Sequence, residues 1–172
     1  VMGNLICVKK GAGKRVMLAA HMDEIGFIVT AIEERGFLRV TNLGGINPKV
    51  AVASHVEMKS GAQGVLFQEA GGAENALFID VGATSREEAE HKAQIGDWGV
   101  VRGVVTDMGN RIAGPYMDDR TGCAVLMETI KRLKDNKSEV VAVFTTQEEV
   151  GLRGAGTAGY ALDPDMAIAL DV

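Results

Sequence analysis

The sequence predicts an α/β domain that is interrupted by a β-rich section. Short apolar segments typical of strands stand near both ends of the chain, and an amphipathic helix accompanies the later ones. The middle of the chain consists of short β-type segments separated by glycine, of which there are 22. The economical organisation is an α/β domain made of residues 1–23 and 104–172, with residues 24–103 inserted as a small β-rich domain.

The α/β part begins with a strand over residues 2–8, and a glycine-rich turn at residues 11–14 connects it to a second strand over residues 15–20. The second strand is short and mostly apolar, and it ends at His21. A polar, metal-binding type of side chain therefore stands at the carboxyl end of a predicted strand.

The inserted section contains several segments with the composition and length of strands. They are Ile25–Glu33, Phe37–Val40, Val50–Met58, Gly64–Gln68, Ala76–Val81 and Trp98–Val105. Residues 85–90 instead favour a helix, because Ser85 can cap it and acidic residues follow in its first turn. The insert is therefore predicted to be mainly β.

The α/β pattern returns after this section. In chain order we predict a helix over residues 119–133, a polar turn over 134–139, a strand over 140–144, a short helix opening in 154–159 and a strand over 166–170. The apolar positions of the first helix approximate one helical face. The run Val-Val-Ala-Val-Phe at 140–144 is typical of a strand buried on both faces.

Composition limits the classes of partner. The 172 residues are 47% apolar and 24% charged, as in ordinary globular proteins, and the net charge is -5. A chain of this charge without a basic stripe does not favour nucleic acid. No apolar run approaches the roughly 20 residues of a membrane helix. We therefore expect neither a nucleic-acid nor a membrane partner.

The two cysteines, Cys7 and Cys123, stand far apart and lack the spacing of a metal or disulfide framework. We expect both to be small buried hydrophobic residues in a protein of the reducing cytoplasm. Val1 is not an initiator residue and no signal-peptide pattern follows it, so we expect the chain to begin inside a longer gene product.

Side chains of the types that bind metals stand at the ends of several predicted elements. They are His21 and Asp23, Asp118 and Asp119, Glu148 and Glu149, and Asp171. Because sites in open α/β sheets form at the carboxyl ends of the strands, we expect these groups to converge on one crevice. Imidazole nitrogen and carboxylate oxygen together suit Zn²⁺, Co²⁺ or Mn²⁺.

Most of these residues have an ordinary alternative explanation. A single histidine at a strand end is more often a satisfied surface or core residue than a ligand, and Asp171 is also consistent with a turn. Asp118 and Asp119 before a helix are more often caps. The pair Glu148–Glu149 is hardest to explain in this way, because adjacent carboxylates directly after a buried strand are costly unless a cation meets them.

Four stretches resemble, in order and spacing, the metal motifs of the M42 family of metalloaminopeptidases. They are AAHMDEIGF at 19–27, MDDRTG at 117–122, QEEVGLRGA at 147–155 and AIALD at 167–171. The resemblance covers nearly the whole chain. It implies a zinc-peptidase-like α/β catalytic domain, here in part, whose inserted β-rich domain mediates homo-oligomeric assembly, from dimers to dodecamers.

The resemblance further implies two divalent metal ions per subunit, zinc or cobalt with manganese as a third possibility. By motif position, His21 and Asp171 would hold one ion, Asp118 would bridge the two, and Glu149 would bind the other.

The same resemblance implies roles for the two remaining acidic residues of the motifs. Glu148 would be the general base that activates water for attack on a peptide substrate. Asp23 would accept the second N–H of His21 and fix the tautomer of that ring. The implied function is the hydrolysis of N-terminal residues from peptides by a metal-dependent aminopeptidase.

One departure from the family pattern concerns length. Members of the family are roughly twice as long, and a second metal-binding histidine lies in their C-terminal part. His55 and His91 do not match that position, and we expect both to be solvent-facing or structural. We therefore expect either that the gene product continues past Val172 or that this is a truncated form in which the ion of Glu149 lacks a ligand.

Three other functions remain open at this stage. A glycoside hydrolase would use two carboxylates, but on separate elements about 5 to 10 Å apart, and relatives of this family have sometimes carried a glucanase label. A catalytically inactive assembly fragment would keep the fold without the activity. A purely structural metal site is the weakest alternative, because structural zinc favours a cysteine-rich shell that this chain lacks.

Overall fold

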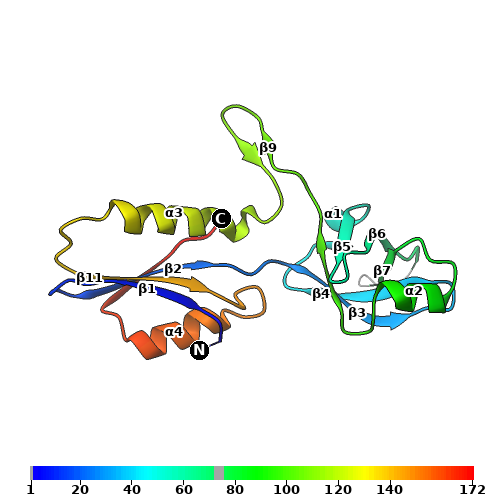
Figure 1. Ribbon diagram of the computed structural model, residues 1–172, viewed down its shortest axis with the longest axis horizontal. Helices are drawn as coiled ribbons and strands as arrows, with labels where there is room; N and C mark the ends of the chain where they lie inside the picture. Colours follow the sequence, from blue (N-terminus) through cyan, green and yellow to red (C-terminus); the bar gives the residue numbers. More distant parts are fainter. Residues whose placement is uncertain (1, 72–75) are drawn as a thin grey trace. The chain divides into compact units, whose positions relative to one another are not determined.

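The computed structural model describes residues 2–71 and 76–172. The chain divides into two compact units: unit 1 comprises Val1–Glu24 and Tyr116–Val172, and unit 2 comprises Ile25–Pro115 (Figure 1). Each unit has its own hydrophobic core. An α/β unit in two chain segments, interrupted by a β-rich unit, agrees with the predicted fold class.

The second boundary between the units lies after Pro115, whereas the sequence analysis placed it after residue 103. The intervening residues carry a two-stranded antiparallel hairpin, β9 (Thr106–Asp107) with β10 (Ile112–Ala113). Gly103 also lies against the Pro115 ring, since a Cβ built on Gly103 would be 3.0 Å from the proline Cδ. The hairpin therefore belongs with unit 2.

Unit 1 contains a four-stranded sheet. Its strands are β1 (Leu5–Lys9), β2 (Arg15–His21), β11 (Glu139–Thr145) and β12 (Met166–Ala169), in the order β1-β11-β2-β12. The last three are mutually parallel and β1 runs antiparallel to β11. The register pairs Thr145 with His21, so β2 and β11 end at the same edge of the sheet. Residues that follow these two strands are therefore neighbours in space.

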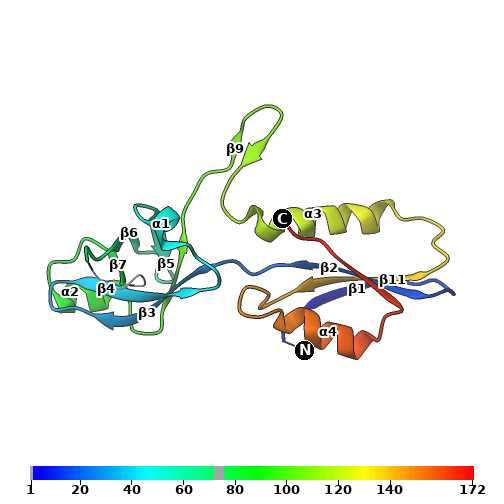
Figure 2. The same ribbon diagram turned by 180° about the vertical axis from the view of Figure 1, so that it is seen from behind.

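Two helices cover opposite faces of this sheet, α3 (Met117–Arg132) on one and α4 (Arg153–Leu162) on the other (Figures 1 and 2). Alternate residues of β11 serve the two faces. Val141 and Val143 pack with Ala158 of α4, while Ala142 and Phe144 pack with Leu126 of α3. The uninterrupted apolar run of β11 is therefore explained by helices on both sides, as the sequence predicted.

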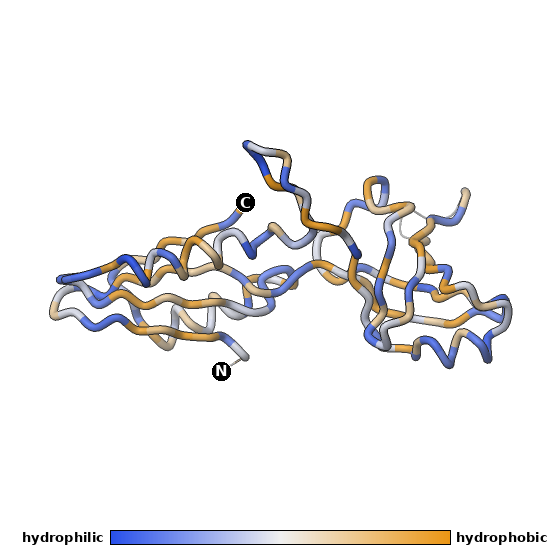
Figure 3. Tube along the Cα trace, turned by 45° about the horizontal axis from the view of Figure 1, so that its top comes forward, coloured by the Kyte–Doolittle hydropathy of each residue, from blue (hydrophilic) through white to orange (hydrophobic). Residues whose placement is uncertain are grey.

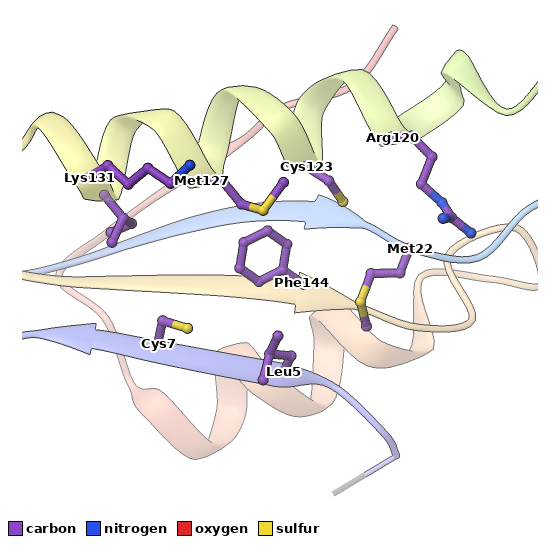
Figure 4. Close-up of a pocket in the computed structure, with 9 residues that line it drawn as sticks. Leu5, Cys7, Met22, Arg120, Cys123, Met127, Lys131 and Phe144 are labelled. Carbon is purple, nitrogen blue, oxygen red and sulfur yellow. The ribbon is translucent and has the colours of Figure 1, made fainter. Parts of the chain in front are cut away.

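The outer strands of the sheet are less covered than its centre. All four residues of β12 are exposed, and on β1 the Leu5 side chain is 55% exposed. A cavity of about 710 Å³ lies between α3, β1 and β11, with mainly apolar side chains pointing into it (Figure 4). Its lining consists of Leu5, Cys7, Met22, Arg120, Cys123, Met127, Ile130, Lys131 and Phe144. The sheet of unit 1 thus leaves apolar surface open at its edges.

Unit 2 is built around a closed six-stranded barrel. Its strands are β3 (Gly26–Ile32), β4 (Phe37–Leu43), β5 (His55–Met58), β6 (Gln63–Gln68), β7 (Leu77–Asp80) and β8 (Trp98–Val101), in the order β3-β4-β7-β6-β5-β8. Phe27, Leu38, Leu66 and Ile79 fill its interior with no exposed surface. Figure 3 shows hydrophobic stretches of the chain, in orange, in both units.

Two short helices accompany the barrel strands, α1 (Pro48–Ala51) and α2 (Arg86–Lys92). The Ser85 hydroxyl accepts the Glu88 N–H at 3.2 Å, which confirms the predicted cap of α2. The prediction of one strand over Val50–Met58 was wrong in its first half. There the Asn47 side chain accepts the Lys49 N–H and Pro48 occupies the first helical position, so a helical turn forms before β5 begins.

None of the helices within residues 2–71 and 76–172 has both the length and the apolar composition that crossing a membrane requires.

Candidate metal centre

His21 lies at the carboxyl end of β2 and is only 3% exposed. Its ring Nδ1 lies 3.0 Å from the backbone carbonyl oxygen of Asp23, and its Nε2 lies 2.8 Å from Oδ1 of Asp118. A carbonyl oxygen can only accept, so Nδ1 carries a proton. With a neutral ring, the lone pair of Nε2 would then face a carboxylate oxygen, which is unfavourable unless a proton or a metal ion lies between them.

Further carboxylates surround the same nitrogen. Oε2 of Glu148 lies 3.9 Å and Oδ1 of Asp171 lies 4.0 Å from Nε2 of His21. The ligand atoms of His21, Asp118 and Glu149 all lie within 4.8 Å of one another. The structure thus brings together the histidine and the carboxylates that the sequence analysis selected from four separate motifs.

The carboxylates of this cluster carry no cationic partner other than His21 among the ion pairs of the described residues. Burial, together with the charges of Asp118 and Glu148, raises the pKa of Glu149 above its ordinary value, although His21 partly offsets this. A divalent cation would relieve that repulsion and would sit among the oxygen and nitrogen ligands it prefers. The donor set therefore fits a metal ion.

The pKa of His21 is also raised. Burial alone would lower it, but the hydrogen bonds to Asp118 and to the Asp23 carbonyl, with the negative charges of Glu148 and Asp118, outweigh burial. Without a metal ion these carboxylates therefore favour the protonated form of the imidazole, with a proton between Nε2 and Asp118. Metal binding would have to displace this proton.

The first residues of α3 hold Asp118 and Asp119, joined by a cis peptide bond, and both depart from helical backbone angles. Asp119 is fully buried and its carboxylate accepts two backbone N–H groups, from His21 at 3.1 Å and from Gly122 at 2.9 Å. A Cβ on Gly122 would lie 2.3 Å from Oδ1 of Asp119, so glycine is needed there. Asp119 caps the regular part of α3 and attaches it to β2.

The pair Glu148–Glu149 lies in the loop that follows β11, directly beside Asp23. The Asp23 carboxylate accepts the backbone N–H of Glu148 at 3.1 Å and that of Glu149 at 3.2 Å. The nearest Asp23 carboxylate oxygen lies 3.8 Å from Nδ1 of His21, too far for a hydrogen bond. Asp23 therefore meets the ring through its main chain, whereas the sequence analysis assigned that contact to its side chain.

Sequence reasoning missed two residues that hold His21 in place. It interpreted Asp119 as a helix cap or metal-type residue, without its bond to the His21 main chain. It interpreted Cys123 as a buried hydrophobic residue, but the Cys123 thiol also donates to the carbonyl of His21, at 3.1 Å. The spacing of Asp119 and Cys123, one helical turn apart, is the signal that could have placed both against one strand.

Three smaller expectations have clear outcomes. Cys123 is buried as predicted, but the prediction for Cys7 was wrong, because β1 lies at an edge and leaves Cys7 exposed. Neither cysteine forms a disulfide. His55 and His91 are both exposed, and both lie in unit 2.

Known proteins match the chain over almost its full length. The M42 glutamyl aminopeptidase family matches residues 3–172. A putative aminopeptidase of Acetivibrio thermocellus is 45% identical over 177 residues, which cover 99% of this chain and 54% of that protein.

Solved structures show the same fold. An aminopeptidase of the archaeon Desulfurococcus kamchatkensis superimposes with a TM-score of 0.91 at 37% identity, over 100% of this chain and 52% of that one. The TET1 peptidase of Pyrococcus horikoshii, described as assembling into a tetrahedron or a large octahedral shell, gives 0.85 at 33% identity over 98% and 56%. The chain spans about half the length of the relatives it matches. It belongs to the M42 glutamyl aminopeptidase family.

Proposed function

We propose that this chain carries most of the dinuclear metal centre of an aminopeptidase that removes N-terminal residues from peptides. The observation that supports this most is the buried Nε2 of His21, 2.8 Å from Asp118, with Glu148 and Asp171 about 4 Å away. So many carboxylate oxygens around one imidazole nitrogen are favourable when a cation lies among them.

The ligands divide between two ions in this proposal. His21 and Asp171 would hold one ion, Glu149 would contribute to the other, and Asp118 would serve both. The position of Asp118 is compatible with this division, because ligand atoms of Asp118, His21 and Glu149 all lie within 4.8 Å of one another. Zinc, cobalt and manganese all suit this mixture of imidazole and carboxylate.

Bound divalent ions would lower the pKa of a water molecule and polarise the carbonyl of the scissile peptide bond. Glu148 accepts a proton from that water while the water oxygen forms a bond to the carbonyl carbon. Glu148 then donates the proton to the amine nitrogen as the C–N bond breaks. Oε2 of Glu148 lies 3.9 Å from Nε2 of His21, which supports a role for this carboxylate beside the proposed ligands and not as one of them.

We further propose a cytoplasmic homo-oligomer in which unit 2 mediates assembly. The two free cysteines are consistent with a reducing compartment. The relative from Pyrococcus horikoshii that forms large shells supports oligomerisation. Unit 2 contains the exposed apolar side chains Val50, Phe67, Val104 and Ile112, which supports a role in contacts with other subunits.

The test compares aminoacyl anilides with cellulose as substrates of the whole protein, each with and without a chelator. Chelator-sensitive hydrolysis of the anilides alone supports the proposal. Hydrolysis of cellulose would favour a glycoside hydrolase. Binding of metal and assembly into oligomers, without hydrolysis of either substrate, would favour an inactive assembly fragment.

A further inference from the structure

Asp23 makes a pair of contacts that the metal centre alone does not require. Its two carboxylate oxygens each accept one backbone N–H, Oδ1 from Glu148 and Oδ2 from Glu149. One N–H group belongs to Glu148, the proposed general base, and the other belongs to Glu149, a proposed metal ligand. A single side chain from the segment after β2 therefore holds the main chain of both.

The rest of the loop is held by other groups. The Asn4 side chain spans its two ends, accepting the Thr146 N–H at 3.1 Å and donating to the Gly154 carbonyl at 2.7 Å. Within the loop, the Glu148 carbonyl accepts the N–H groups of Gly151 and Leu152. Among the hydrogen bonds of the described residues, the N–H groups of Glu148 and Glu149 themselves go to Asp23 alone.

The ring of His21 has a hydrogen-bond acceptor other than this carboxylate. Its Nδ1 proton goes to the main-chain carbonyl of Asp23, which any residue at this position would supply. The main chain of His21 is held from the other side, by Asp119 and Cys123. Removal of the Asp23 carboxylate would therefore leave the acceptor for Nδ1 in place.

We propose that Asp23 is a positioning residue whose carboxylate fixes the backbone of Glu148 and Glu149. Hydrogen bonds from neutral N–H groups to a charged acceptor are stronger than those between neutral groups. The Asp23 side chain is only 25% exposed. The consequence of this anchoring of Glu148 and Glu149 for catalysis rests on the function proposed above. The hydrogen bonds that make the anchor do not depend on that function.

The direct experiment measures amide hydrogen exchange in the metal-free protein by NMR. In Asp23→Ala the amides of Glu148 and Glu149 should exchange at least about tenfold faster, while the His21 amide stays within about twofold. Asp23→Asn should leave one of the two amides protected, because the amide side chain keeps only one acceptor oxygen.

Asp165→Ala is the matched control. Asp165 also accepts a backbone N–H through its carboxylate, from Arg15 at 2.7 Å, but it does so away from the loop after β11. This variant should leave the exchange of Glu148 and Glu149 unchanged. Unchanged exchange of both amides in Asp23→Ala, with the barrel amides still protected, would overturn the anchoring.

A second readout separates the anchor from an effect on the imidazole. Cobalt(II) is titrated into variants that each lack one ligand, and its visible absorption reports binding. In a His21→Ala background, Asp23→Ala should weaken the remaining site at least about tenfold. In a Glu149→Gln background, where the His21 site remains, the same change should cost less than about threefold. The reverse pattern would show that Asp23 acts through His21.

Failure of this inference and failure of the proposed function are distinguishable. If the amides of Glu148 and Glu149 are unaffected while the protein hydrolyses aminoacyl anilides, the anchor is wrong and the aminopeptidase stands. If the amides respond as expected but no substrate is hydrolysed, the anchor stands and the proposed function is wrong.

Discussion

The barrel of unit 2 and the sheet of unit 1 differ in whether every strand has a neighbour on both sides. The barrel closes on itself, so each of its six strands has two neighbours and its interior side chains reach zero exposure. The sheet is open at β1 and at β12, and its outer strands keep exposed apolar residues. Closure gives a self-contained core, whereas the open sheet leaves the ends of its strands free to carry chemistry.

The polar groups of the two units follow the same division. In the barrel, charged residues pair at the surface, as Arg39 does with Glu33 and Glu69. In the sheet, carboxylates gather around one buried histidine without Lys or Arg partners among the ion pairs of the described residues. If this comparison is correct, changes in one unit should alter stability and changes in the other should alter metal binding or turnover.

The largest effect is expected for Glu148→Gln, which removes the proposed general base but no proposed metal ligand. Turnover of an aminoacyl anilide by the whole protein should fall by roughly 10²- to 10⁴-fold. Metal content, measured by atomic absorption, should stay nearly the same, because Gln keeps the size of the side chain. Turnover at the wild-type rate would remove Glu148 from the mechanism.

A change in the barrel core should lower stability and leave metal binding intact. Leu38 is fully buried there, and Leu38→Ala should lower the free energy of unfolding of unit 2 by about 2–5 kcal/mol. Cobalt(II) affinity at the metal centre should remain close to that of the wild type. The matched surface variant Ile95→Ala, at a residue 59% exposed, should change stability by less than about 0.5 kcal/mol. Denaturant titration with cobalt(II) binding in parallel makes the comparison, and a large loss of metal affinity in Leu38→Ala would break it.

His21→Ala should weaken one metal site selectively, by at least about tenfold, with a corresponding decrease in metal stoichiometry. The control is His55→Ala, because His55 is exposed in unit 2 and has no place in the metal centre. Isothermal titration of the metal-free protein with Zn²⁺ distinguishes the two variants. An unchanged stoichiometry in His21→Ala would sink the assignment of His21 as a ligand.

The last prediction concerns the dependence of metal binding and stability on pH. The pKa values of His21 and Glu149 are both raised in the metal-free protein, so the folded state binds these protons more tightly than the unfolded state does. Their stabilising contribution is present at low pH and is lost as pH rises through the folded pKa values. Metal competes with the same protons, so metal affinity should rise with pH, by up to about tenfold per unit for each proton displaced.

Titrations in buffers of different ionisation enthalpy measure the number of protons released on metal binding. Proton release close to zero at every pH tested would contradict a raised pKa of His21 in the metal-free protein. The variant His21→Ala should release fewer protons than the wild type.

The sequence was sufficient for the elements whose signals are local. The run 140–144 predicted a strand buried on both faces, and Ser85 predicted a helix cap. Two of the places where it failed are those where a neighbour overrides composition. Residues 50–51 have the β-branched and small composition of a strand, but Asn47 and Pro48 start a helical turn there. Cys7 is apolar and strand-forming, but its strand lies at the edge of the sheet.

The sequence could predict which residues of the site lie close together, but not how they contact one another. Motif order and strand ends indicated that His21, Asp118, Glu148, Glu149 and Asp171 converge. Whether Asp23 contacts His21 through its carbonyl or its carboxylate depends on the path of the main chain after β2, which sequence spacing does not determine. The same holds for the bond between Asp119 and the His21 main chain, which joins residues 98 positions apart.

The measurement that tests the proposed metal-dependent aminopeptidase most directly is hydrolysis of an aminoacyl anilide panel by the whole protein before chelation, after chelation, and after Zn²⁺ or Co²⁺ is restored. We predict that hydrolysis is lost on chelation and recovers with added metal for at least one anilide. Hydrolysis that persists at full rate in the metal-stripped protein would contradict a metal centre at His21, Asp118, Glu149 and Asp171.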